Sequence, residues 1–264
     1  MDQESGKDRR VLNCIPSRDT EKDWRPRHAD QARAARAGQA ALPPSVDLRA
    51  GRPWWKIGDQ GSTGSCVGWA TADSVLRWHF TEKGRLPKKA SLSPRFIWMA
   101  AKETDEFRSE PTTFIEADGT SLKAALDISR RFGVVAETVL PFSGGLFQGE
   151  TEDFFAIAAQ LKIASYHNVG LDPLEWRRWL AKRGPILTRL DCDDTWMNAV
   201  NGQLKTYHPD TRQGGHAVAI VGYRADGSFI VRNSWATIWG DAGYAYASKA
   251  YAAAAFTEAY GVLV

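Results

Sequence analysis

The 264-residue sequence has only three cysteines, Cys14, Cys66 and Cys192, and they lie far apart. An odd, widely spaced set makes no disulfide framework, so we expect a reducing, cytoplasmic location. No pair among the cysteines and the five histidines has the short spacing that holds zinc. We therefore predict neither a metal nor a cofactor.

The sequence also lacks a long apolar run and a charge excess of either sign. No stretch approaches the roughly 18 apolar residues of a membrane span, and the charged start MDQESGKDRR has no apolar core of a secretory signal. The net charge is only +3, with basic and acidic residues mixed along the chain. We expect no nucleic-acid or membrane partner, and a monomer.

The chain divides into an N-terminal arm and one larger domain. Residues 1–41 are dense in mixed charge and end in an alanine-rich stretch, where a short helix could precede Pro43. In the domain, 42–264, helical patterns prevail over about 61–160 and short β-branched or aromatic runs over about 161–264. This order predicts an α+β fold with a helical lobe followed by a lobe of antiparallel strands.

Local signals place several of these elements. Apolar spacing predicts a helix over 67–80, and Ser93 followed by Pro94 predicts the start of a second. A third should begin near Thr120 or Ser121 and stop at Gly133. A fourth is expected within LDPLEWRRWLAKRG, and strands within PILTRLD, HAVAIVGYR, GSFIVRNSW, GYAYAS and AYGVLV.

One cysteine has a setting suited to chemistry. In DQGSTGSCVGWATADSVLRWHF a glycine-rich loop runs into a helix, with Cys66 in its first turn and Ser65 as the expected N-cap. A helix N-terminus stabilises a thiolate, which is the nucleophilic form of cysteine. Cys66 is therefore a candidate nucleophile, and the alternative is a buried structural cysteine.

A base and its orienting partner stand much later in the chain. His216 follows two glycines in QGGHAVAIVGY, and Asn233 comes 17 residues further on, after the next strand. Adjacent antiparallel strands would bring the two side chains together, so that Asn233 orients the imidazole and Trp235 covers their hydrogen bond. Gln60, six residues before Cys66, could stabilise an oxyanion together with the Cys66 backbone N–H.

The blocks QGSTGSCVGWA, GGHAVAIVGY and VRNSWATIWGDAGY resemble the signature blocks of the papain-like cysteine peptidases, over roughly residues 42–264. The resemblance implies a papain-like two-lobe fold with the active-site cleft between the lobes. It also implies a Cys66 nucleophile, a His216 base and acid, an Asn233 orienter and a Gln60 oxyanion donor. The substrate-binding residues expected with it are Gly64, Ser65, Gly119, Thr120, Gly215 and Trp235.

The sequence departs from the family pattern at several positions. Thr63 stands where a disulfide-forming cysteine is familiar, Val67 replaces a common tryptophan, and Thr120 follows Gly119 where a glycine pair is usual. Arg189, on a strand that borders the main specificity pocket in the family, suggests a preference for acidic or polar side chains. The alternative is a solvated arginine on a strand edge.

The arm is the larger departure, because nothing in residues 1–41 resembles the family's helical pro-segment. One hypothesis is that the arm lies across the cleft and inhibits the enzyme, with Cys14 engaging Cys66 as a redox or steric latch. The other is a tether packed elsewhere. For the whole chain we predict a peptidase acting on peptide or protein substrates, as an endopeptidase. Alternatives are an acyl-transferring amidase or transpeptidase, or an inactive binding module.

Overall fold

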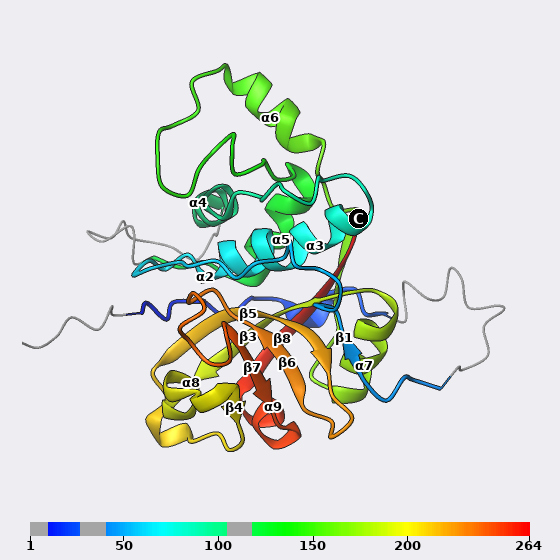
Figure 1. Ribbon diagram of the computed structural model, residues 1–264. Coiled ribbons are helices and arrows are strands. Elements are labelled where there is room, and N and C mark those ends of the chain that lie inside the picture. The colour runs from blue at the N-terminus through cyan, green and yellow to red at the C-terminus, as the bar shows by residue number, and fades with distance from the viewer. Residues whose placement is uncertain (1–9, 27–40, 105–117) are drawn as a thin grey trace, which may run out of the picture.

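The computed structural model describes residues 10–26, 41–104 and 118–264, and it shows two lobes with a segment of the N-terminal arm between them (Figure 1). Helices form the upper lobe in this view and a curved sheet forms the lower one. The predicted order, with helices first and strands second, is therefore confirmed. The alanine-rich helix predicted before Pro43 falls outside the described residues.

The helical lobe is built on the segment that begins at Cys66. Its elements are α2 (Cys66–Gly68), a π-helical stretch (Trp69–Leu76), α3 (Arg77–Glu82), α4 (Pro94–Thr104), α5 (Leu122–Arg131) and α6 (Thr151–Ala159). The predicted caps of α4 and α5 are confirmed. The Ser93 hydroxyl accepts a hydrogen bond from the Phe96 N–H at 3.1 Å, and Ser121 accepts from the Ala124 N–H at 3.3 Å.

Two local predictions for the first helix need correction. The helical run is continuous over 66–82, but its middle has the wider π-helical turn rather than the expected α-helical one. Ser65 stands at the N-cap position without capping, since its hydroxyl shares a hydrogen bond with the Thr63 hydroxyl at 2.6 Å. Its backbone, at φ −85° and ψ 11°, lies outside the extended region that a capping residue normally adopts.

The second lobe is one sheet with the strand order β2-β8-β3-β5-β6-β7-β4, and β1 pairs with β5. Every pairing is antiparallel except that of β4 with β7. The strands are β1 (Val46–Asp47), β2 (Ser165–Asn168), β3 (Ile186–Cys192), β4 (Gln203–Leu204), β5 (Gly214–Tyr223), β6 (Phe229–Arg232), β7 (Tyr244–Ala247) and β8 (Phe256–Leu263). The described α-helices of this lobe are α7 (Pro173–Lys182), α8 (Asp194–Asn198) and α9 (Lys249–Ala255).

A buried ion-pair network joins the lobes beneath the cleft. Arg232 at the end of β6 pairs with Asp73 of the π-helical stretch at 2.5 Å, and Arg77 binds the other oxygen of Asp73 at 2.9 Å. Arg232 also donates to the Lys56 carbonyl at 2.7 Å. Because a buried charge needs such partners, the network holds the Cys66 helix against the sheet.

The described part of the arm, residues 10–26, runs between the two lobes (Figure 1). Asn13 forms a bridge to Gly215 at the start of β5, and Ile15 forms one to Ser121 at the start of α5. Pro16 follows Ile15 and disfavours a helical backbone there, which favours the extended conformation. The arm thus contributes backbone to both walls of the cleft.

Candidate active site

The predicted meeting of histidine and asparagine occurs. β5 and β6 are antiparallel neighbours, and the His216 Nε2 atom lies 2.8 Å from the Asn233 Oδ1 atom, with both side chains buried. Oδ1 also accepts from the Ser234 backbone N–H at 2.8 Å, so Nε2 is the protonated nitrogen of His216. His216 Nδ1 has no partner among the described residues and remains available as a base.

A set of tryptophans surrounds this pair. The Trp235 ring lies 4.8 Å from the His216 ring, where it was predicted to shield the hydrogen bond, and the Trp196 ring lies 5.6 Å away. Trp239 packs against Trp196 at 4.6 Å between ring centroids. Sequence reasoning missed both: Trp239 lies within the block VRNSWATIWGDAGY but was given no role, and Trp196 lies outside all three blocks.

Cys66 begins α2 and is fully buried, and α2 packs against β5 beside His216. Burial raises the pKa of the Cys66 thiol to about 11, although the backbone N–H groups of Ala217, Val67 and Asn13 favour its thiolate. Burial likewise lowers the pKa of His216 to about 4, against the opposing effect of the Asn233 hydrogen bond. The thiolate expected from the helix N-terminus is therefore not favoured in this conformation, because water is excluded from the sulfur.

Gln60 is fixed within the loop that precedes Cys66. Its side-chain oxygen accepts from the Ser234 hydroxyl at 2.9 Å, and its Nε2 donates to the Thr63 carbonyl at 2.9 Å. Gly64 and Ser65 are buried in the same loop.

The arm occupies the predicted substrate-binding residues. The Cys14 N–H donates to the Gly215 carbonyl at 2.9 Å, and the Ile15 N–H donates to the Thr120 carbonyl at 3.1 Å. A Cβ atom added to Gly119 would lie 1.4 Å from the Asn13 carbonyl oxygen, so only glycine permits this approach. The cleft is therefore filled by residues 13–15 of the chain itself.

Arg189 lies against this segment. It is 4% exposed, and its Nε atom donates to the Cys14 carbonyl at 2.9 Å. Its other nitrogens bind the Thr257 hydroxyl at 2.7 Å and pair with Asp191 at 3.1 Å. The alternative of a solvated arginine on a strand edge is wrong, because the guanidinium is enclosed by the arm and the sheet.

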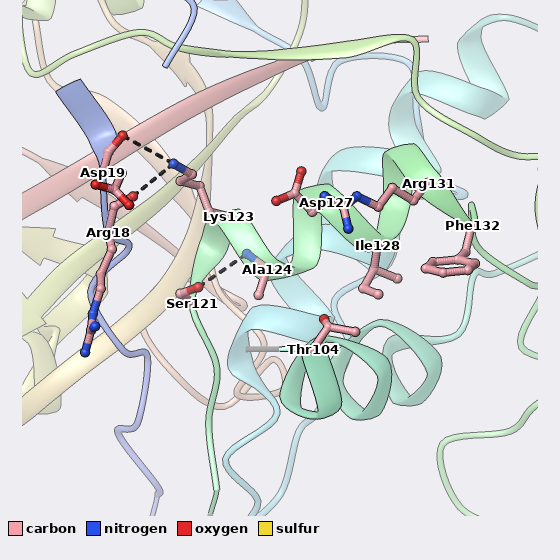
Figure 2. A pocket seen from close by; sticks show the side chains of 10 residues that line it. All are labelled: Arg18, Asp19, Thr104, Ser121, Lys123, Ala124, Asp127, Ile128, Arg131 and Phe132. Atoms are coloured by element: carbon pink, nitrogen blue, oxygen red, sulfur yellow. Dashed lines mark hydrogen bonds between the residues drawn. The ribbon is translucent and has the colours of Figure 1, made fainter. Parts of the chain in front are cut away.

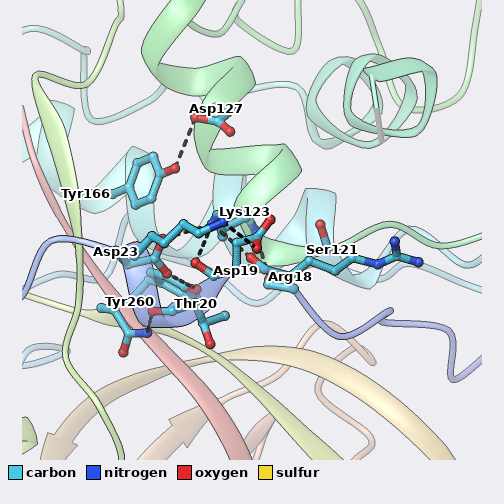
Figure 3. Close-up of polar contacts among 12 residues, drawn as sticks. Arg18, Asp19, Thr20, Asp23, Ser121, Lys123, Asp127, Tyr166 and Tyr260 are labelled. Atoms are coloured by element: carbon cyan, nitrogen blue, oxygen red, sulfur yellow. Dashed lines mark hydrogen bonds and ion pairs between the residues drawn. The ribbon is translucent and has the colours of Figure 1, made fainter. Parts of the chain in front are cut away.

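A second set of contacts holds residues 17–23 of the arm to Lys123 in the first turn of α5 (Figure 3). The Lys123 backbone N–H donates to the Ser17 hydroxyl at 3.2 Å, and its ammonium group donates to the Arg18 carbonyl at 2.9 Å. The same ammonium pairs with Asp23 at 2.9 Å, and Asp23 also accepts from the Tyr260 hydroxyl at 2.7 Å. Sequence reasoning missed these residues, because no short spacing connects them.

We call the contacts of residues 17–23 with Lys123 the anchor. Beside it, a cavity of about 240 Å³ opens along α5 (Figure 2). Its lining includes Arg18 and Asp19 of the arm and Asp127 and Arg131 of α5, but none of Gln60, Cys66, His216 or Asn233.

The described residues include no group of three or more histidine, cysteine or acidic side chains that could hold a metal ion. None of the helices described is long and apolar enough to span a bilayer.

Comparison with known proteins points to one family. Residues 42–260 match the model of the papain family of cysteine proteases. A cathepsin L-like proteinase from Fasciola hepatica is 25% identical over 79% of this chain, which spans 61% of that protein's length. Among solved structures, xylellain, a cysteine protease from Xylella fastidiosa, is 22% identical with a TM-score of 0.77, covering 98% of this chain and 99% of that one. The Amb a 11 cysteine protease, a ragweed pollen allergen solved in its proform, has a TM-score of 0.64 at 22% identity, covering 90% of this chain and 72% of that one.

Proposed function

The chain belongs to the papain family of cysteine proteases, and we propose that it is an endopeptidase that uses Cys66, His216, Asn233 and Gln60. The observation that carries this assignment is the 2.8 Å contact between His216 Nε2 and Asn233 Oδ1, beside the helix that begins at Cys66. It leaves Nδ1 of His216 unprotonated, and His216 lies on β5, the strand against which α2 packs. A base so oriented suits proton transfer from a thiol.

Each residue then has one role in the reaction. With the arm displaced, His216 Nδ1 takes the Cys66 proton, and the thiolate attacks the peptide carbonyl carbon. The oxyanion accepts hydrogen bonds from the Cys66 backbone N–H and from Gln60 Nε2. His216 returns the proton to the leaving amine, which leaves a thioester on Cys66. Water, deprotonated by His216, then hydrolyses the thioester and releases the acid.

We also propose that residues 1–41 inhibit the enzyme. Described residues 13–15 fill the cleft, and the Asn13 backbone N–H is directed toward the Cys66 sulfur. This segment therefore covers the nucleophile in the closed state. The ragweed relative solved in its proform is a protease that also carries a precursor segment.

Two finer expectations belong to the same proposal. Displacement of the arm would free Arg189 Nε from the Cys14 carbonyl, which supports a preference for substrates with acidic or polar side chains at that position. A panel of fluorogenic peptides tests this preference, and tight selection of leucine or phenylalanine would contradict it. Acceleration of product formation by added amines would instead favour the acyl-transfer alternative.

The decisive experiment is labelling with an epoxide inhibitor of papain-like enzymes, followed by intact mass measurement. We expect a single adduct on the wild type, none on Cys66→Ala, and an unchanged adduct on Cys192→Ser, which removes a buried cysteine outside the proposed machinery. Peptide hydrolysis should follow the same order. An adduct on Cys66→Ala, or peptide hydrolysis by that variant, would contradict the assignment of the nucleophile.

A further inference from the structure

All three cysteines, although far apart in sequence, meet one short stretch of β5. The Cys14 N–H donates to the Gly215 carbonyl at 2.9 Å, Cys192 is the strand partner of Gly214, and the Ala217 N–H is directed toward the Cys66 sulfur. All three are free thiols, each no more than 3% exposed. The three cysteines of the chain therefore contact residues that flank the proposed catalytic histidine in β5.

Cys14 is the better placed of the two possible partners of Cys66. The Asn13 N–H faces the Cys66 sulfur, and Cys14 is the next residue, about 3.5 Å further along an extended chain. Cys66 is also near enough to raise the pKa of the Cys14 thiol. Cys14 and Cys66 also belong to the same buried cluster, whereas Cys192 packs in the separate cluster on the other side of the sheet. Cys192 is further held within β3 by its pairing with β5.

We propose that Cys14 and Cys66 are a redox-modification site, in which a hydroperoxide such as hydrogen peroxide converts the two thiols into a disulfide that locks the arm in the cleft. The inference rests on the proposed function, because it requires an arm that opens and a Cys66 thiolate that reacts. It goes beyond inhibition by the arm, since it makes the closed state covalent and reversible.

The chemistry has two balanced steps. While the arm is displaced, the Cys66 thiolate attacks a peroxide oxygen, so that an S–O bond forms, the O–O bond breaks, and hydroxide leaves and is protonated to water. When the arm returns, the Cys14 sulfur attacks the Cys66 sulfenic acid. The S–S bond forms, the S–O bond breaks, and water leaves with the Cys14 proton. A dithiol reductant reverses the result and releases both thiols.

The physical benefit is protection of the nucleophile. Both thiols are enclosed in the closed state, so oxidation can begin only when the arm moves. A sulfenic acid without a nearby thiol proceeds to sulfinic acid, which reductants do not restore. Cys14 would instead trap Cys66 at the reversible stage.

The test is a peroxide pulse on the full chain, followed by thiol counting, non-reducing peptide mapping and activity before and after dithiothreitol. We expect the wild type to fall from three free thiols to one, with a peptide linking Cys14 to Cys66 and activity restored by the reductant. Cys192→Ser should behave in the same way. Cys14→Ser should gain two oxygen atoms on Cys66 and recover at least about tenfold less activity than the wild type.

Several results would overturn the proposal. These are a wild type that keeps all three thiols, a crosslink that joins Cys66 to Cys192, or a Cys14→Ser variant that recovers as fully as the wild type. Thiol counts and peptide maps need no turnover, so they separate this inference from the proposed function. Epoxide labelling of Cys66 without a disulfide would refute the redox site alone, and absence of labelling and hydrolysis after arm displacement would refute the peptidase itself.

Discussion

The two segments of the arm are held in different ways. Residues 13–15 cross the cleft through backbone groups, with hydrogen bonds to the Gly215 and Thr120 carbonyls. Residues 17–23 are held by charged and polar side chains, chiefly through the pair of Lys123 with Asp23. The first segment blocks the site, and the second anchors the block.

The difference shows where the specificity of inhibition lies. A backbone contact is available to almost any extended segment, as it must be in a cleft that accepts many peptides. The anchor depends on particular residues, because Lys123 binds two arm carbonyls and a carboxylate at once. Substitutions in the anchor should therefore change inhibition more than side-chain substitutions in the blocking segment.

The largest change in stability should come from the buried ion-pair network that joins the two lobes, between which both arm segments lie. Asp73→Asn removes a charge between Arg232 and Arg77, and the Arg232 side chain is fully buried. We expect a loss of about 3–5 kcal/mol in the free energy of unfolding, measured by urea denaturation. Glu82→Gln breaks a partly exposed pair with Arg52 and is the matched control, with an expected loss below about 1 kcal/mol. Equal losses in the two variants would show that the buried network does not join the lobes.

A pH change should test the blocking segment. The closed state lowers the pKa of His216 to about 4, below the roughly 6.5 of an exposed histidine, so it binds fewer protons than the open state. Between these values, falling pH should favour opening, by up to about 3 kcal/mol once pH is below 4. Burial raises the pKa of Glu258, which also faces the arm, and its protonation favours closure and offsets part of the effect.

Hydrogen exchange of residues 10–26 in Cys66→Ala, corrected for intrinsic rates, measures this opening without turnover. Exchange should increase from pH 7 toward pH 4.5, and the added substitution His216→Phe should remove most of the increase. A pH dependence that survives in the double variant would assign the titration to another group.

The anchor should respond to loss of the Lys123 charge. Lys123→Met keeps most of the aliphatic stem but removes the pair with Asp23 and the bonds to the Arg18 and Asp19 carbonyls. We expect the closed state to weaken by about 1–2 kcal/mol, which raises peptide hydrolysis by the intact chain roughly tenfold. Lys22→Met, whose pair with Asp19 is exposed, should leave the rate unchanged. An equal rise in the hydrolysis rate of both variants would show that the contacts of Lys123 hold the arm no better than an exposed ion pair.

The smallest change in hydrolysis rate should come from Ile15, where two substitutions distinguish the backbone contribution from the side-chain contribution. Ile15→Pro removes the N–H that donates to the Thr120 carbonyl, whereas Ile15→Ala keeps it. Loss of that bond should weaken closure by about 0.5–1.5 kcal/mol and raise the hydrolysis rate several-fold. The Ala variant should change the rate less. A larger effect of Ala than of Pro would mean that side-chain packing, and not the backbone, holds the blocking segment.

Much of the fold and of the proposed site was predictable because the signals are local. The Ser93 and Ser121 caps act on an N–H three residues later, and the strands flanking the turn between His216 and Asn233 bring those two residues together. Such patterns act over a few residues or between adjacent strands. For this reason they can be identified in the sequence before any tertiary contact is known.

The sequence by itself determined the two-lobe order, the identity of the candidate catalytic residues and the glycine that a crossing backbone requires. Only the tertiary structure decided that the arm fills the cleft, that Arg189 binds it and that burial reverses the expected ionisation of Cys66. The Arg189 to Cys14 bond joins residues 175 apart, and the Ser17 to Glu258 bond joins residues 241 apart. Contacts at such separations have no local pattern, and the pKa of a buried group depends on everything that excludes water from it.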